Sequence, residues 1–188
     1  PRTVQGKTAE SPLEQVRHTV DEVLNILNDK QLSQAERQEE KQQQIMAVIR
    51  DRFDFREMSK LTLARHWRQL NQEEQNRFAD LFADLLRNTY IGRVESYYDE
   101  EVRVIFNNQD IRDNKAVVSS VVISDNKEIP IDYRLKIQNG KWLVYDVVIE
   151  GVSLVRNYRS QFSRILEREK FAGLLERMKE KINSGGKS

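Results

Sequence analysis

The side chains that most often carry catalysis or bind metals are scarce in this chain. Its 188 residues include no cysteine, which excludes thiolate nucleophiles, disulfides and cysteine-ligated metal sites. The two histidines, His18 and His66, fall on separate predicted helices, and neither belongs to an H-E-x-x-H pattern. Each is interpreted as a residue of a helix surface, and neither a metal site nor a cofactor site is predicted.

Asp146 is the residue whose predicted surroundings could place a reactive group in a pocket. A predicted hairpin puts it opposite Tyr133 on an otherwise apolar face, where a carboxylate is costly unless it is paired, hydrogen-bonded or protonated. One interpretation is a structural aspartate bonded to the Tyr133 hydroxyl, to backbone N–H groups, or to Arg156 or Arg159. The other is a general base that acts with Tyr133 on a hydrophobic substrate, as in small α+β isomerases and dehydratases.

That hairpin lies within residues 127–162. Its first strand alternates apolar with polar residues, as a strand with one buried face does. Asn139-Gly140 supplies the positive φ angles of a two-residue type I′ turn, which fixes the register. The predicted facing pairs are Ile137 with Trp142, Leu135 with Val144, Tyr133 with Asp146, and Ile131 with Val148.

Helical and strand patterns alternate in blocks along the rest of the chain. Capping boxes at Ser11–Glu14, Ser33–Glu36 and Asn71–Glu74 start three helices, and Ser153 is a candidate N-cap after Gly151. The predicted helices cover about residues 12–29, 33–50, 53–68, 71–94, 153–166 and 171–182. Strands at 102–106 and 117–123, separated by a polar turn at 107–113, join the hairpin. The inward face of the second strand is ambiguous, because Val117, Val121 and Ile123 compete with Val118 and Val122. A longer loop at 124–127 would settle the choice, and the sequence leaves its length open.

This order predicts an α+β fold: a curved antiparallel sheet of four strands, or slightly more, packed by several helices. A single domain is expected over residues 11–182, with flexible tails at 1–10 and 183–188. Such a sheet either closes on a solid core or leaves an apolar cavity, and the pattern allows both.

Charge and hydropathy narrow the function classes. The 31 Lys and Arg residues nearly balance the 30 Asp and Glu residues, so no global field is available to collect nucleic acid. No apolar run approaches the roughly 18 residues of a membrane span. The sequence starts at Pro1 without a signal-peptide pattern, so a leader has either been removed or lies outside the sequence.

Several short motifs lie in a characteristic order. The first group is Trp67-x-x-Leu70, Glu73-x-Gln75, Phe78, Phe82, Leu85-Leu86 and Tyr90. The hairpin contributes Ile131-Asp132-Tyr133-Arg134-Leu135, Gly140-Lys141-Trp142 and Tyr145-Asp146-Val147. The segments EGVSL at 150–154 and NYRSQF at 157–162 complete the set. Together they cover approximately residues 13–182 and closely resemble the MlaC family, also called toluene-tolerance auxiliary proteins.

The resemblance implies a non-enzymatic, monomeric carrier of the Gram-negative periplasm, with its signal peptide removed. Such proteins ferry phospholipids between an outer-membrane lipoprotein complex and an inner-membrane ABC transporter complex with an MCE-domain subunit. It implies that the sheet and helices enclose an apolar cavity for acyl chains, with the headgroup near solvent and phospholipid as the ligand in place of a cofactor. The pocket enzyme with Asp146 and Tyr133 is the alternative.

Candidate lipid-binding residues follow from the hairpin register and from the apolar stripes of the other elements. The expected sheet wall is Ile131, Tyr133, Leu135, Trp142 and Val144. Candidates for the remaining wall are Leu81, Leu85, Val104, Phe106, Val121, Tyr158, Phe162 and Leu166. Arg156 or Arg159 is expected either to meet a lipid phosphate or to remain a surface or Asp-paired arginine.

Overall fold

The computed structural model describes residues 10–32, 34–98 and 102–185. It contains a five-stranded antiparallel sheet in which neighbours in sequence are neighbours in space, in the order β1-β2-β3-β4-β5. The strands are β1 (Arg103–Arg112), β2 (Lys115–Ser124), β3 (Lys127–Gln138), β4 (Lys141–Ile149) and β5 (Val152–Ser153). The predicted α+β class with a slightly enlarged antiparallel sheet is therefore confirmed.

Tight turns join the strands of this meander. Asn139 and Gly140 have φ values of 50° and 75°, as the predicted type I′ turn requires. Asp125 and Asn126, at 48° and 62°, form a similar turn, so the connection at 124–127, whose length the sequence left open, is a tight turn and not a longer loop. Aspartate and asparagine tolerate this left-handed conformation better than most residues, which makes so short a connection possible.

The first strand is longer than predicted. Residues 107–112 were expected to form a polar turn, but they continue β1 after a bulge between Phe106 and Asn108. β1 is an edge strand with largely exposed side chains, so its second half needs no apolar alternation. The apolar alternation typical of a strand is absent there because all residues of 107–112 except the half-buried Gln109 are exposed to solvent.

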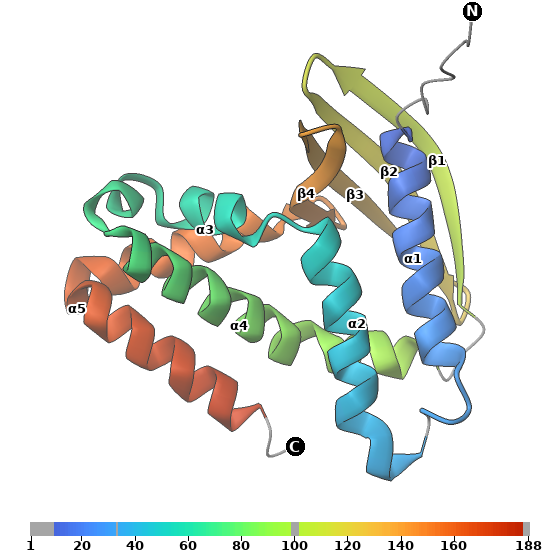
Figure 1. Cartoon of the computed structure of the whole chain (residues 1–188), viewed down its shortest axis with the longest axis horizontal. Helices are drawn as coiled ribbons and strands as arrows, with labels where there is room; N and C mark the ends of the chain where they lie inside the picture. The colour runs from blue at the N-terminus through green and yellow to red at the C-terminus, as the bar shows by residue number, and fades with distance from the viewer. Residues whose placement is uncertain (1–9, 33, 99–101, 186–188) are drawn as a thin grey trace, which may run out of the picture.

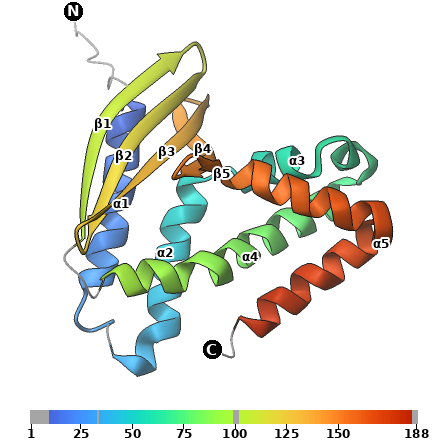
Figure 2. The ribbon, with the colours of Figure 1, turned by 180° about the vertical axis from the view of Figure 1, so that it is seen from behind.

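The helices are α1 (Pro12–Asn28), α2 (Gln38–Arg52), α3 (Phe55–Leu63), α4 (Gln72–Tyr98) and α5 (Leu154–Ser184), with short 3₁₀ turns at Ala35–Arg37 and Ala64–Gln69. Helix α1 lies along the concave face of the curved sheet, and α3, α4 and α5 form a separate helical layer (Figures 1 and 2). α2 and α4 pack with the end of α1 through Leu27, Ile45, Met46 and Ile91. Within the described residues, no helix has the length and hydrophobicity that crossing a bilayer requires.

Helix starts follow the predicted caps. In α1, Ser11 Oγ accepts from the Glu14 backbone at 3.3 Å, and the Glu14 carboxylate accepts from the Ser11 backbone at 3.3 Å. Asn71 and Glu74 form the same reciprocal pair at 2.9 and 2.8 Å. These two capping boxes are confirmed because each depends on neighbouring residues alone. The box predicted at Ser33–Glu36 includes Ser33, which lies outside the described residues, and α2 begins at Gln38 after a 3₁₀ turn.

The last helix bends sharply at Lys170, where φ is 58° and ψ is −174°. The two predicted helices of this region are the two arms of α5, and the second arm returns along α4. Asn88 of α4 donates to the Ile182 carbonyl at 2.7 Å, which satisfies a backbone acceptor near the end of that arm.

The hairpin register differs from the prediction beyond Leu135. Leu135 faces Val144 and Ile137 faces Trp142, as expected, but Arg134 faces Asp146 because a bulge leaves Tyr145 without a partner. One extra residue reverses the alternation, so Tyr133 faces Val147 and Ile131 faces Ile149. The predicted pairs of Tyr133 with Asp146 and of Ile131 with Val148 were therefore wrong.

Candidate functional site

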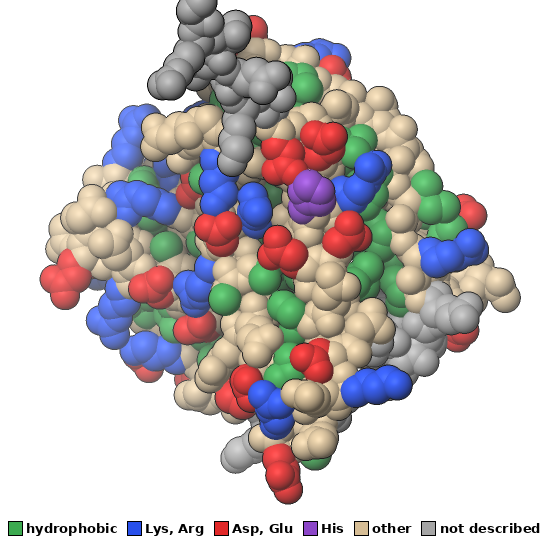
Figure 3. Space-filling model, turned by 45° about the vertical axis from the view of Figure 1, so that its right-hand side comes forward, with side chains coloured by type: hydrophobic (Ala, Val, Ile, Leu, Met, Phe, Trp, Pro, Cys, Tyr) green, Lys and Arg blue, Asp and Glu red, His purple; other side chains and the backbone are tan. Residues whose placement is uncertain are grey.

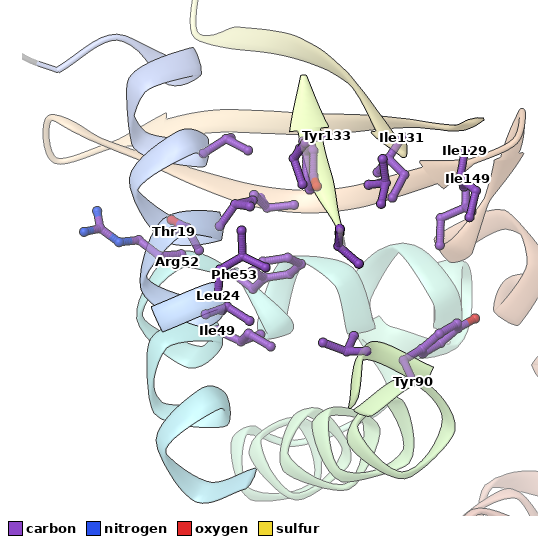
Figure 4. A pocket seen from close by; sticks show the side chains of 18 of the residues that line it. Thr19, Leu24, Ile49, Arg52, Phe53, Tyr90, Ile129, Ile131, Tyr133 and Ile149 are labelled. Atoms are coloured by element: carbon purple, nitrogen blue, oxygen red, sulfur yellow. The ribbon is translucent and has the colours of Figure 1, made fainter. Parts of the chain in front are cut away.

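A cavity of about 420 Å³ lies between the sheet and the helices. Its walls are the concave face of the sheet, the inner face of α1, the end of α2 with Phe53, and the second half of α4 (Figure 4). This volume falls within the roughly 300–1,000 Å³ typical of small-molecule pockets. The molecule thus holds an apolar hollow where a solid core would otherwise join its two layers.

The sheet wall follows from the period of two along each strand. Successive inward residues of four strands point into the hollow, and those of β3 and β4 stay in phase only because of the bulge at Tyr145. The lining residues from the sheet are Val104, Val122, Ile129, Ile131, Tyr133, Leu135, Trp142, Val144 and Ile149.

The helical wall comes mainly from α1, an amphipathic helix. Its outer face mixes side chains of both charges around a histidine (Figure 3), and His18 there pairs with Glu10. Its inner stripe lines the cavity, together with residues from the end of α2 and from α4. The apolar members of this wall are Val16, Val20, Val23, Leu24, Leu27, Ile49, Phe53, Tyr90 and Val94.

Gln15 and Thr19, two polar residues of the wall, are satisfied by the protein itself, whereas the buried Nε of the lining residue Arg52 makes no hydrogen bond within the described part of the chain. Gln15 Oε1 accepts from the Trp142 backbone at 2.9 Å, and the Thr19 hydroxyl donates to the Gln15 carbonyl at 2.7 Å. Burial raises the pKa of Tyr133, and a hydrogen bond with Ser120 acts in the opposite direction. Tyr133 is therefore neutral at physiological pH, and the lining around Gln15, Thr19 and Tyr133 offers hydrocarbon and satisfied dipoles.

Charged side chains stand at the two ends of the cavity. At one end the Arg52 guanidinium points away from the hollow beside α1 (Figure 4), with its Nε 3.5 Å from an Asp51 oxygen. At the other end, Ile129 and Ile149 of the sheet lie across from Tyr90 of α4. Arg93 and Glu150, both exposed, also line that second end, which we call the rim.

Six of the thirteen predicted lining residues border this cavity. They are Val104, Ile131, Tyr133, Leu135, Trp142 and Val144. Five others belong to the core of the helical layer, where Leu85, Tyr158 and Phe162 are buried and Leu81 and Leu166 pack against them. The apolar stripes of α4 and α5 face each other there, so these side chains lie away from the hollow.

The remaining two predicted lining residues come from the sheet. Phe106 packs against the cluster between the sheet and α1, with the Arg17 guanidinium 5.5 Å above its ring. Val121 pairs with Ile105 and Pro130, on the convex face, whereas its neighbour Val122 lines the cavity. The ambiguous run of valines in β2 is resolved in favour of Val122.

Asp146 lies on the face of the sheet opposite the cavity. Its carboxylate accepts from the Ser153 hydroxyl at 2.6 Å, from the Val155 backbone at 3.0 Å, and from Arg134 at 3.4 Å. The basic partner is thus Arg134 of the neighbouring strand, in place of Arg156 or Arg159. Asp146 and Tyr133 share no pocket, so the alternative in which they act together on one substrate does not fit the geometry.

The two headgroup candidates, Arg156 and Arg159, are exposed on the first turns of α5 and do not line the cavity. Among the described residues, no group of three or more His, Asp and Glu side chains could hold a metal ion. Sequence reasoning missed the contribution of α1, although its stripe of valines and leucines was visible. That stripe identifies a buried face without identifying what the face covers.

Comparisons with known proteins agree with the architecture. A curated relative from Haemophilus influenzae, the intermembrane phospholipid transport system binding protein MlaC, is 24% identical over 123 residues. That match spans 63% of this chain and 57% of the relative's length. The solved structure of a phospholipid-binding protein from Ralstonia solanacearum, in complex with a phospholipid, superposes with a TM-score of 0.84 and 27% identity. It covers 95% of this chain and 100% of the other.

The family comparison covers most of the sequence. The model of the MlaC protein family matches residues 17–180, which include all five helices and five strands at least in part. The chain belongs to the MlaC family.

Proposed function

We propose that this protein binds a phospholipid, with acyl chains in the cavity and the headgroup at the rim. The observation that carries the proposal is the apolar hollow itself, lined by aliphatic side chains from the sheet and from α1. The Ralstonia relative, which shares the fold, was solved with a phospholipid bound.

The energetics of such binding need no covalent or charged anchor. Each methylene that leaves water contributes about 0.8 kcal/mol, so even a partly buried acyl chain gains several kcal/mol. A phosphate near Arg93 would remain hydrated while making a charge-assisted contact. This division places hydrocarbon against Val122 and Ile131 and leaves the polar end in water.

The same chemistry suits a carrier. A protein of this kind, working as a single domain in the periplasm, would shield the acyl chains of a phospholipid while it crosses water. Its proposed partners are an outer-membrane lipoprotein complex and an inner-membrane ABC transporter complex with an MCE-domain subunit. The name of the Haemophilus relative, which places that protein in intermembrane phospholipid transport, supports this role.

Native mass spectrometry with a matched pair of substitutions tests the proposal. Val122→Trp fills the cavity, whereas Val121→Trp adds the same side chain to the opposite face of the same strand. Protein purified from a Gram-negative host should carry phospholipid in the wild type and in Val121→Trp. In Val122→Trp the fraction of protein with bound phospholipid should fall by at least about tenfold, because the indole occupies space that several acyl-chain methylenes would fill.

Two results would contradict the proposal. One is wild-type protein free of phospholipid after purification and after incubation with phospholipid vesicles. The other is loss of lipid in Val121→Trp but not in Val122→Trp, which would place the ligand on the convex face.

A further inference from the structure

The rim of the cavity exposes aliphatic side chains to solvent. Among the described residues, four large aliphatic side chains are exposed, and two of them, Val94 and Val152, lie at the rim with 38% and 59% of their surface accessible. Val94 lines the cavity itself. Val152 pairs with Ile149 across the β4–β5 turn, so it shares the sheet face of that lining residue.

Basic side chains adjoin these valines. The segment from Gly151 to Leu166 contains Arg156, Arg159 and Arg164 and no acidic residue, and Glu150, immediately before it, is the acidic residue of the rim. All three guanidinium groups are exposed, and none is in an ion pair within the described part of the chain. Because the Arg156 N–H bonds Ser153 Oγ at 3.1 Å in the first turn of α5, Arg156 lies within about 10 Å of Val152.

The position of this segment is fixed by buried bonds. Asp146 on β4 accepts from the Ser153 hydroxyl and from the Val155 backbone, at 2.6 and 3.0 Å, and thereby holds the start of α5 against the sheet. The start of α5, with Val152 just before it and Arg156 in its first turn, is thus held at a fixed position on the sheet.

We propose that this rim docks on an anionic phospholipid bilayer, with Val152 and Val94 entering the interface and Arg156 and Arg159 contacting lipid phosphates. The inference rests on the proposed function. Docking of the rim would turn the cavity opening toward the bilayer, and a phospholipid would pass through that same opening. Interfacial binding of proteins combines buried apolar area with attraction of basic residues to anionic lipids, and the rim has both.

The composition of the rim favours a bilayer over a protein partner. Its exposed apolar side chains are valines, and valine is under-represented among the energetic hot spots of protein interfaces. Mobile lipid phosphates can adapt to arginines at any spacing, while a rigid acidic protein surface must match them.

Vesicle flotation of the full chain tests the proposal. We expect the wild type to float with vesicles of phosphatidylcholine containing phosphatidylglycerol at low salt. It should not float with phosphatidylcholine alone, and high salt should release it because it screens exposed charges. Val152→Ser should lower the partition coefficient about tenfold. The Arg156→Gln and Arg159→Gln pair should lower it about 30-fold, at about 1 kcal/mol per arginine.

Matched controls lie on other surfaces. Ile105→Ser removes an aliphatic side chain of similar exposure from the edge strand, and the Arg65→Gln and Arg68→Gln pair removes two exposed arginines from the 3₁₀ turn after α3. Both controls should bind vesicles like the wild type. Failure of the wild type to float at low salt, or equal losses in controls and rim variants, would overturn the proposal and leave the rim to a protein partner.

Native mass spectrometry of the same samples separates the two proposals. Neither Val152 nor the two arginines line the cavity, so their variants should keep their bound phospholipid. If the protein carries phospholipid but does not bind vesicles, the result overturns bilayer docking and leaves the proposed function intact. Protein that never holds a lipid overturns the proposed function.

Discussion

Asp146 is the residue whose role changed most between sequence and structure. It is 3% exposed, and its two oxygens together accept from Ser153, Val155 and Arg134. A buried carboxylate persists where its lone pairs are satisfied, and here they join the sheet to the first turn of α5. The group therefore acts as a structural clamp between the two layers.

We predict that Asp146→Ala lowers the free energy of unfolding by about 2–4 kcal/mol, because it leaves a buried hydroxyl, an N–H and a guanidinium without their acceptor. Urea denaturation at equal lipid load measures the change. Asp132→Ala, on the same face of the neighbouring strand, should cost less than about 1 kcal/mol. Bound phospholipid should survive in folded Asp146→Ala, and its selective loss at unchanged stability would contradict a structural role.

At the scale of the element, α5 is held in a bend that its sequence does not obviously favour. Lys170 adopts φ 58° and ψ −174°, a region that only glycine occupies at low cost. Arg177 bonds Glu169 across the bend at 2.8 and 2.9 Å, and a Cβ on Gly173 would approach the Glu169 Cβ to 2.5 Å. Packing of the second arm on α4 offsets the strain.

We predict that Lys170→Gly raises the free energy of unfolding by about 1 kcal/mol, because relief of a strain of roughly 1–3 kcal/mol outweighs the destabilising gain in unfolded-state entropy. Glu167→Gly, in the regular part of the same helix, should instead lower it by about 1 kcal/mol. Chemical denaturation of both variants gives the comparison. Equal destabilisation by the two glycines would mean that α5 passes through Lys170 without a bend.

At the scale of the whole molecule, the cavity occupies the place where a core would join sheet and helices. Among the described residues, the buried apolar side chains form three separate clusters around it. A ligand that fills the hollow would contact α1, α4 and the sheet together, and it would thus contribute to folding.

We therefore expect removal of lipid to lower the thermal midpoint and reloading to restore it. At a free lipid concentration of 100 times the Kd, bound lipid raises the free energy of unfolding by about 2.7 kcal/mol. Differential scanning calorimetry of delipidated and reloaded protein measures it. Val122→Trp should melt at the same temperature with or without lipid, and a lipid-dependent shift in that variant would place the ligand elsewhere.

The sequence by itself determined the features that depend on near neighbours. Ser11 with Glu14 and Asn71 with Glu74 start helices where predicted, because each cap closes within one turn. Asn139-Gly140 fixed the first two hairpin pairs, and with them the inward direction of Leu135 and Trp142. Period and turn chemistry are local, so a single sequence is enough to read them.

Only the tertiary structure decided what each apolar face covers. The stripes of α1, α4 and α5 look alike in sequence, yet α1 lines the cavity while most of the α4 and α5 stripes form a separate core. The bulge at Tyr145 moved Asp146 from the cavity face to the α5 junction. The hydrophobic effect is non-directional, so an apolar stripe does not specify which surface it will contact. The packing of the whole chain decides which stripe lines the cavity and which forms solid core.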